Sequence, residues 1–257
     1  MVNAATKAGR SLTRDFGEVA NLQVSLKGPG DFVSQADLKA EKTIQEMLEH
    51  ARPGWGFVGE ESGAREGREP HRWIVDPLDG TTNFLHSIPM FAVSIGAEVQ
   101  GELRAGVIYN PITEELFTAE KGSGAFLNDR RIRVAARKRL SDCVIGTGVP
   151  AISKKEHGRA LVAQRHVMGE VAAVRATGSA ALSLAFVAAG RFDGYYETGL
   201  KSWDVAAGLA ILREAGGFAS APLPKESIYE TGRIVCGNEY VHKQLREVIQ
   251  RPVPAKS

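Results

Sequence analysis

The chain has 257 residues, of which 43% are hydrophobic and 24% are charged, and its 32 basic and 30 acidic residues leave a formal net charge of only +2. The composition is typical of a globular protein, and the length suits one large domain or two halves that share a core. The small net charge argues against a nucleic-acid or membrane-surface protein. The sequence has no signal-peptide core, no apolar run of about 20 residues, no C-x-x-C pair and no histidine cluster, so we expect a cytoplasmic protein without a zinc site.

The first part of the chain predicts two helices beside an antiparallel sheet. Apolar residues at helical spacing predict a helix over 3–20 and a second helix that begins after Ser34, an N-cap residue, and ends at Pro53. A short strand follows at 56–59. Further strands with alternating hydrophobicity and glycine-containing turns are predicted at 91–99, 103–109, 115–119 and 124–134.

Near residue 140 the pattern changes to an alternation of strands and helices, which is typical of an α/β fold. Short apolar runs predict strands at 144–149, 171–176 and 234–236. Helical patterns occupy 153–168, 179–190, 203–215 and 239–250. We therefore expect an α/β protein with an α+β part at 1–139 and an α/β part at 140–257. Because no linker-like composition separates these parts, we expect them to pack as one unit.

Residues 74–84, with the sequence Ile-Val-Asp-Pro-Leu-Asp-Gly-Thr-Thr-Asn-Phe, carry the clearest functional signal. Pro77 favours an extended conformation for Asp76, and Gly80 permits a tight turn that brings the backbone close to a ligand. Across such a turn Asp76 and Asp79 would point into one small volume, where they repel each other unless a cation lies between them. Oxygen ligands beside free N–H groups suit Mg²⁺ and a phosphate. The alternative is an ordinary aspartate-rich turn after a strand.

Three more acidic residues stand at the ends of predicted elements. Glu60 follows a strand, Asp37 lies near the start of the second helix, and Asp204 lies at the head of a later helix. Each has an alternative interpretation, because an acid in the first turn of a helix favours the helix dipole and an exposed glutamate can be a solvated loop residue. A basic cluster at 130–133 and 137–139 is likewise interpreted as a solvated hairpin and linker.

In chain order these segments resemble the inositol monophosphatase family of Mg²⁺-dependent, lithium-sensitive phosphatases, and its bacterial branch most closely. The resemblance covers about residues 27–238 and implies a layered α-β-α-β-α architecture and a homodimer. The matching segments are D-F-V-S-Q-A-D at 31–37, G-E-E-S at 59–62, W-I-V-D-P-L-D-G-T-T-N-F at 73–84, T-G-S-A-A-L at 177–182, Y-Y-E at 195–197, W-D-V-A-A-G at 203–208 and E-A-G-G at 214–217.

The resemblance also implies a metal site that holds two or three Mg²⁺ ions. These ions would offset the negative charges of the carboxylates. They would also stabilise charge on the attacking and leaving oxygens of an in-line displacement by water. A third, weaker ion would use Glu60 and waters. The first two ions would be held by Glu60, Asp76, the carbonyl of Leu78 and Thr81, and by Asp76, Asp79 and Asp204.

Catalytic and substrate roles follow from the same resemblance. Thr81, paired with Asp37, would orient the attacking water and help to deprotonate it, and Glu60 completes the implied catalytic set. The N–H groups of Gly80 and Thr81 would bind the phosphate. The polyol hydroxyls would contact Asp79, Ala180 and Glu197.

The expected reaction is hydrolysis of the phosphate monoester of a small polyol, with inositol 1-phosphate as the first candidate. Fructose 1,6-bisphosphate, the 2′-phosphate of NADP and adenosine 3′,5′-bisphosphate remain alternatives, because relatives with the same chemistry accept them. The spacing of Asp76 and Asp79 excludes the D-x-D-x-[TV] segment of aspartyl-phosphate enzymes, and no G-x-S-x-G elbow occurs, so direct attack by water is favoured. A non-catalytic alternative is a contact with the transcription machinery through the basic cluster.

Overall fold

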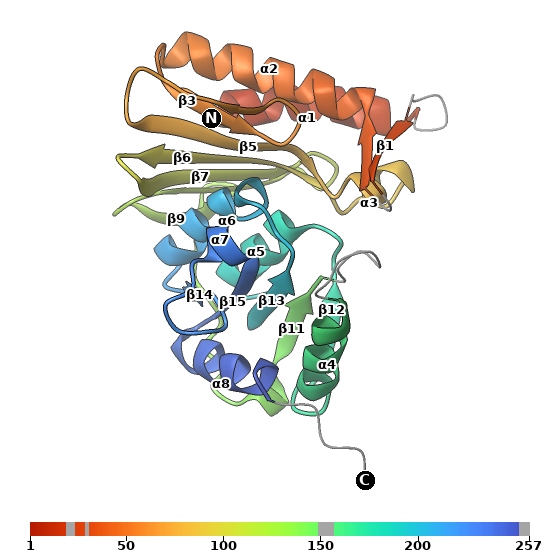
Figure 1. Cartoon of the computed structure of the whole chain (residues 1–257), viewed down its shortest axis with the longest axis vertical. Helices are drawn as coiled ribbons and strands as arrows, with labels where there is room; N and C mark the ends of the chain where they lie inside the picture. Colours follow the sequence, from red (N-terminus) through yellow and green to blue (C-terminus); the bar gives the residue numbers. More distant parts are fainter. Residues whose placement is uncertain (19–23, 29–30, 149–156, 252–257) are drawn as a thin grey trace.

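The computed structural model describes residues 1–18, 24–28, 31–148 and 157–251. Within them the chain forms layers in the order helix, sheet, helix, sheet, helix (Figure 1). Helices α1 (Val2–Phe16) and α2 (Gln35–Ala51) cover the outer face of the larger sheet, and α5 (Ala180–Ala188) and α6 (Ser202–Glu214) lie between the two sheets. This arrangement confirms the predicted layered α/β class.

The larger sheet has the strand order β10-β9-β8-β7-β6-β5-β3-β4 and is antiparallel except where β3 runs parallel to β5. A separate pair, β1 (Val24–Gly28) and β2 (Asp31–Ser34), precedes it. The strands of the larger sheet are β3 (Gly56–Gly59), β4 (Gly63–Arg65), β5 (His71–Asp79), β6 (Ala92–Val99), β7 (Glu102–Asn110), β8 (Glu115–Glu120), β9 (Gly124–Leu127) and β10 (Arg130–Ile132).

The smaller sheet has the order β12-β11-β13-β15-β14, with parallel pairs around β11 and antiparallel pairs around β15. Helices α4 (His157–Met168) and α8 (Glu239–Ile249) cover its outer face (Figure 1). The remaining elements are β11 (Val144–Thr147), β12 (Ala173–Ala176), β13 (Gly194–Thr198), β14 (Phe218–Ser220), β15 (Arg233–Gly237), α3 (Thr81–Leu85), α7 (Ile228–Thr231) and a 3-10 turn at Leu140–Asp142.

Helix α6 is apolar on all sides because it is packed between two sheets. Every residue from Val205 to Leu212 is buried. On the larger sheet its backbone approaches β7 so closely that a Cβ atom at Gly106 would lie 2.4 Å from the carbonyl oxygen of Ala207. Glycine at this position therefore allows the helix to lie directly on the sheet, which fixes the head of α6 relative to β5 and β6.

Several predicted boundaries were wrong. The single strand predicted at 124–134 is the hairpin of β9 and β10, because Asn128 and Asp129 adopt φ angles of 45° and 63° and turn the chain. The first helix ends at Phe16, before the predicted end at residue 20. The predicted helix at 153–168 is present from His157 to Met168, and its first predicted residues, 153–156, lie outside the described residues.

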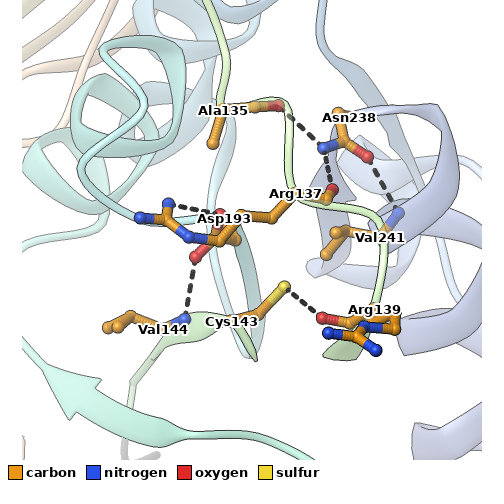
Figure 2. Close-up of polar contacts among 8 residues, drawn as sticks. All are labelled: Ala135, Arg137, Arg139, Cys143, Val144, Asp193, Asn238 and Val241. Carbon is orange, nitrogen blue, oxygen red and sulfur yellow. Dashed lines mark hydrogen bonds and ion pairs between the residues drawn. The ribbon is translucent and has the colours of Figure 1, made fainter. Parts of the chain in front are cut away.

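The connection from β10 to β11 is held against the smaller sheet by two buried polar side chains (Figure 2). The amide of Asn238 donates to the carbonyl oxygens of Ala135 and Arg137, at 2.8 and 2.7 Å. The carboxylate of Asp193 accepts from the N–H of Val144 at 2.8 Å and pairs with the Arg137 guanidinium at 3.1 Å. Part of the basic cluster therefore has a structural role in this connection.

Neither cysteine is in a disulfide, and both Cys143 and Cys236 are buried. In the described part of the chain no helix combines the length and the apolar character that crossing a membrane requires.

Candidate metal centre

Three aspartates meet where β5 ends beside the head of α6. Each of Asp76, Asp79 and Asp204 contributes a carboxylate oxygen to a group whose atoms all lie within 4.8 Å of one another. Asp76 is only 2% exposed and Asp79 9% exposed, so the first two acids are almost removed from solvent. Asp204 lies in the first turn of α6, and one of its oxygens accepts the N–H of Lys201 at 2.6 Å.

A bulge in β5, rather than the predicted turn, brings Asp76 and Asp79 together. Asp76 pairs with Ser94 on β6 and Asp79 pairs with Ala92, so three steps on β5 face two steps on β6. In a regular strand, residues three apart point to opposite faces of the sheet. The extra residue at the bulge, beside Pro77, shifts by one the alternation of side chains between the two faces of the sheet. Both carboxylates can therefore face α6.

Glu60 joins this cluster from the neighbouring strand. It directly follows β3, and its N–H donates to the carbonyl of Val75, the residue before Asp76, at 3.2 Å. It is not one of the three acids of the tight group, but a side-chain hydrogen bond and its charge both act on Asp76. The parallel pairing of β3 with β5 therefore carries the acid of the Gly-Glu-Glu-Ser segment to the aspartates.

The environment raises the pKa of all three aspartates. Burial raises the pKa of Asp76 well above its usual range, and the charges of Glu60, Asp79 and Asp204 raise it further. Burial likewise raises the pKa of Asp79 to about 6, although the Ser179 hydroxyl and the Ala181 N–H oppose the shift. The pKa of Asp204 is raised by burial and by Asp79. A cluster of buried, mutually repelling carboxylates fits a hard divalent cation, which offsets this repulsion.

A second group of polar atoms adjoins the aspartates. The Thr81 hydroxyl lies 3.1 Å from Oδ1 of Asp37 and 3.0 Å from the carbonyl oxygen of Leu78. The N–H of Leu78 donates to Asp76 at 2.9 Å. Gly80 precedes Thr81 with a φ of 99°, and a Cβ atom there would lie 2.9 Å from the carbonyl oxygen of Met90, so glycine is required at this turn. Asp37 itself is fully buried.

The start of helix α5 holds Asp79 in place. The Ser179 hydroxyl donates to Oδ2 of Asp79, and the N–H of Ala181 donates to the same oxygen at 2.7 Å. Ser179 is also the N-cap of α5, where its side chain accepts from Leu182. Ser179 was not among the predicted site residues, although it directly precedes Ala180 in the segment at 177–182. Its local sequence, a serine directly before a run of helical residues, predicts an N-cap but not the contact with Asp79.

The predicted polyol contacts flank the cluster. Ala180 is the first residue of α5, beside Asp79, and Glu197 lies on β13. The hydroxyl of the buried Tyr195 donates to Oε2 of Glu197, a contact that the sequence did not indicate. The charge of Glu197 contributes to the raised pKa of Asp204, which places the two acids within electrostatic reach of each other.

The chain matches the family model described as inositol monophosphatase family over residues 1–254. It is 62% identical over 257 residues to the inositol-1-monophosphatase of Rhizobium meliloti, a match that covers 100% of this chain and 97% of that protein. It is 40% identical to the Nus factor SuhB of Pseudomonas aeruginosa, over 98% of this chain and 95% of that protein. The crystal structure of the extragenic suppressor protein suhB from Bartonella henselae resembles it with a TM-score of 0.95 and 58% identity, covering 98% of each chain.

Proposed function

Because the chain belongs to the inositol monophosphatase family and is a phosphatase, we propose that it hydrolyses the phosphate monoester of a small polyol, inositol 1-phosphate first, in a Mg²⁺-dependent reaction. The observation that carries this proposal is the group of three aspartate carboxylates within 4.8 Å of one another, next to the Thr81–Asp37 hydrogen bond. The name of the Rhizobium meliloti relative supports the choice of substrate.

The residues that would hold two or three Mg²⁺ ions are those around the β5 bulge. Bound there, Mg²⁺ would offset the charges of the carboxylates and the phosphate and stabilise charge on the attacking and leaving oxygens. The raised pKa values of Asp76 and Asp204 support this assignment, because they show that these carboxylates repel one another. A bound cation would offset that repulsion. The proposed ligands are Glu60, Asp76, the Leu78 carbonyl, Asp79, Thr81 and Asp204.

The attacking water would be oriented by the Thr81 hydroxyl. That hydroxyl can donate its proton to Asp37 and accept a hydrogen bond from water, so a proton of the water can pass toward the buried carboxylate while its oxygen forms the bond to phosphorus. The bond from phosphorus to the ester oxygen breaks on the opposite side, and the leaving oxygen takes up a proton from a solvent water. The N–H groups of Gly80 and Thr81, at the turn into α3, would bind the phosphate oxygens.

The polyol would lie between Asp79 and β13. Asp79 is held by Ser179 and Ala181, and Glu197 is held by Tyr195, so both carboxylates are fixed before substrate arrives. Fixed acceptors suit hydroxyl groups whose positions on a ring are also fixed. With Ala180 they form the proposed specificity contacts.

The decisive experiment measures phosphate release from inositol 1-phosphate with and without Mg²⁺, beside fructose 1,6-bisphosphate, NADP and adenosine 3′,5′-bisphosphate. We expect Mg²⁺-dependent release, inhibition by lithium and the highest kcat/KM for inositol 1-phosphate. Turnover without divalent metal would contradict the mechanism. A higher kcat/KM for another ester would contradict the assignment of inositol 1-phosphate as the substrate. Light scattering on the same sample tests the expected homodimer.

A second candidate function follows from the name of the Pseudomonas aeruginosa relative, which is a Nus factor. Residues 130, 131 and 133 of the basic cluster are exposed, whereas Arg137 and Arg139 pair with Asp193 and Asp142. We propose these three arginines as the surface for a contact with the transcription machinery. Recovery of RNA polymerase factors by a catalytically impaired Asp76→Asn variant would support this role, and no recovery would count against it. Recovery that is unaffected by replacement of the three arginines would contradict the assignment of this surface.

A further inference from the structure

A buried glutamate on α2 holds the loop that carries Glu60. Glu41 is only 3% exposed, and its two carboxylate oxygens accept the backbone N–H groups of Glu61 and Ser62 at 2.9 and 2.8 Å. Among the described residues no cation pairs with it. A buried carboxylate is tolerated only when its oxygens are hydrogen-bonded, so these two amides are the groups that keep Glu41 in the core.

Gly59 makes this contact possible. A Cβ atom at this position would lie 2.4 Å from Oε2 of Glu41, closer than any side chain tolerates. The glycine thus leaves space for a carboxylate to reach the amides two and three residues further along. The Gly-Glu-Glu-Ser segment therefore has one member that admits Glu41, one that faces the metal site and two whose N–H groups are held.

Glu60 is consequently fixed from two directions. Its own N–H is bonded to the carbonyl of Val75 on β5, next to Asp76, at 3.2 Å. The next two N–H groups are bonded to Glu41 on α2. Turn residues without such bonds can rotate, whereas the Glu60 backbone is bonded to the strand and its next two neighbours are bonded to the helix.

The same face of α2 holds the other side of the site. Asp37 lies four residues before Glu41, which is about one helical turn, and both belong to the buried stripe of the helix. Asp37 bonds Thr81 at 3.1 Å while Glu41 bonds the loop of Glu60. One helix therefore sets the distance between Glu60 and Thr81, two proposed site residues that are 21 residues apart in sequence.

We infer that Glu41 is a positioning residue for the metal centre: its two-point hold on the Glu61 and Ser62 amides sets where Glu60 meets the cation. This inference rests on the proposed function, because it gives Glu60 the role of a Mg²⁺ ligand. Groups that orient metal ligands without touching the metal typically change metal affinity by about 10–100-fold when they are replaced.

The test uses two substitutions of Glu41 that separate positioning from charge. Glu41→Gln keeps the size but offers an NH₂ group to one of the two N–H donors. Glu41→Asp keeps the charge but is too short to reach both amides. The matched control is Glu49→Gln, because Glu49 lies on the same helix and binds Arg65 of the adjoining strand at 3.1 and 3.3 Å, but on the surface.

Mg²⁺ affinity is measured by titration calorimetry without substrate, on variants whose thermal unfolding confirms a folded state. We expect both Glu41 variants to bind Mg²⁺ about tenfold or more weakly, and the Glu49 variant to match the unmodified chain. In phosphate-release assays the Mg²⁺ concentration for half-maximal rate should rise by the same factor. At saturating Mg²⁺ the KM for inositol 1-phosphate should stay unchanged, which a general loss of structure would not produce.

Two results would overturn the inference. Unchanged Mg²⁺ affinity in folded Glu41→Gln would show that the hold does not act on the metal site, and full affinity in Glu41→Asp would show that only the charge matters. Both outcomes leave the proposed function intact when the unmodified chain binds Mg²⁺ and releases phosphate. Absence of Mg²⁺ binding by the unmodified chain would overturn the proposed function and this inference together.

Discussion

The Thr81 hydroxyl lies 3.1 Å from Oδ1 of Asp37, and this bond joins the turn after β5 to the first turn of α2. The same hydroxyl lies 3.0 Å from the Leu78 carbonyl oxygen. Because a threonine hydroxyl has one proton, it donates to only one of these acceptors at a time. A cation bound by the carbonyl would direct the proton to Asp37 and leave the oxygen lone pairs available.

Replacement of Thr81 by alanine should therefore lower kcat by about 10²–10⁴-fold, the range typical of lost general acid–base catalysis, with a smaller change in KM. Thr81→Ser should retain much of the rate. Thr43→Ala is the matched control, because its hydroxyl also bonds a backbone carbonyl, that of Lys39 at 2.9 Å, but on the surface. Steady-state kinetics decide the matter, and a defect confined to KM would refute the role assigned to Thr81.

Asp204→Asn should have opposite effects on activity and on the stability of the metal-free protein. Loss of a ligand carboxylate should lower kcat by at least about 10²-fold. Loss of one of several repelling charges should raise the unfolding temperature in a chelator, since the pKa of Asp204 is raised in the fold. Phosphate release and thermal unfolding measure the two effects, with the exposed Asp129→Asn as control. A less stable metal-free variant would contradict the proposed charge repulsion.

The raised pKa of Asp79 predicts how stability depends on pH. Its folded-state value of about 6 exceeds the ordinary 3.8, so the metal-free fold binds this proton more tightly than the unfolded chain does. The resulting stability is fully present below about 3.8 and is lost as the pH rises through about 6. Asp76 and Asp204 act in the same direction.

Because Mg²⁺ binds the deprotonated carboxylates, the rise in unfolding temperature caused by Mg²⁺ should grow over the same pH range. Thermal unfolding between pH 5 and about 8, with and without Mg²⁺, measures both trends. A Mg²⁺ effect that is independent of pH would show that these acids do not bind the ion.

Ser179→Ala should affect both α5 and Asp79. Removal of an N-cap hydroxyl costs about 0.5–2 kcal/mol of stability. Because the Ser179 hydrogen bond lowers the pKa of Asp79, its loss should raise that pKa and move Mg²⁺ binding to higher pH. Denaturant unfolding and Mg²⁺ titrations at several pH values measure the two changes. Ser227→Ala is the control, because Ser227 caps α7 without a side-chain hydrogen bond. Equal pH profiles for the two variants would exclude an effect on Asp79.

Local patterns predicted much of the fold, whereas the candidate site residues were predicted from the resemblance to a family. Apolar spacing placed α2, α6 and α8 within a few residues of their ends, because a helix that buries one side must repeat its apolar residues at that spacing. Short elements such as β13, β14 and α7 were not predicted, since their few residues acquire order from neighbours that are distant in sequence.

The contacts that the sequence did not reveal join residues far apart in the chain. Ser179 bonds Asp79 across 100 positions, and Glu41 bonds the N–H of Glu61 across 20. A serine before a helix and a glutamate within one have ordinary local roles, so nothing in their own surroundings marks them. Their partners are decided by the packing of α5 and α2 against the larger sheet.

By itself, the sequence determined which chemical groups are available: the spacing of Asp76 and Asp79, the glycine after them and the acids at 37, 60 and 204, together with their resemblance to a phosphatase family. Only the tertiary structure decided that the aspartate segment is a strand bulge and that its carboxylates face α6. The physical reason is that the face of the sheet to which a side chain points depends on strand register. The register of β5 is set by its pairing with β6, a long-range interaction that the local sequence does not contain.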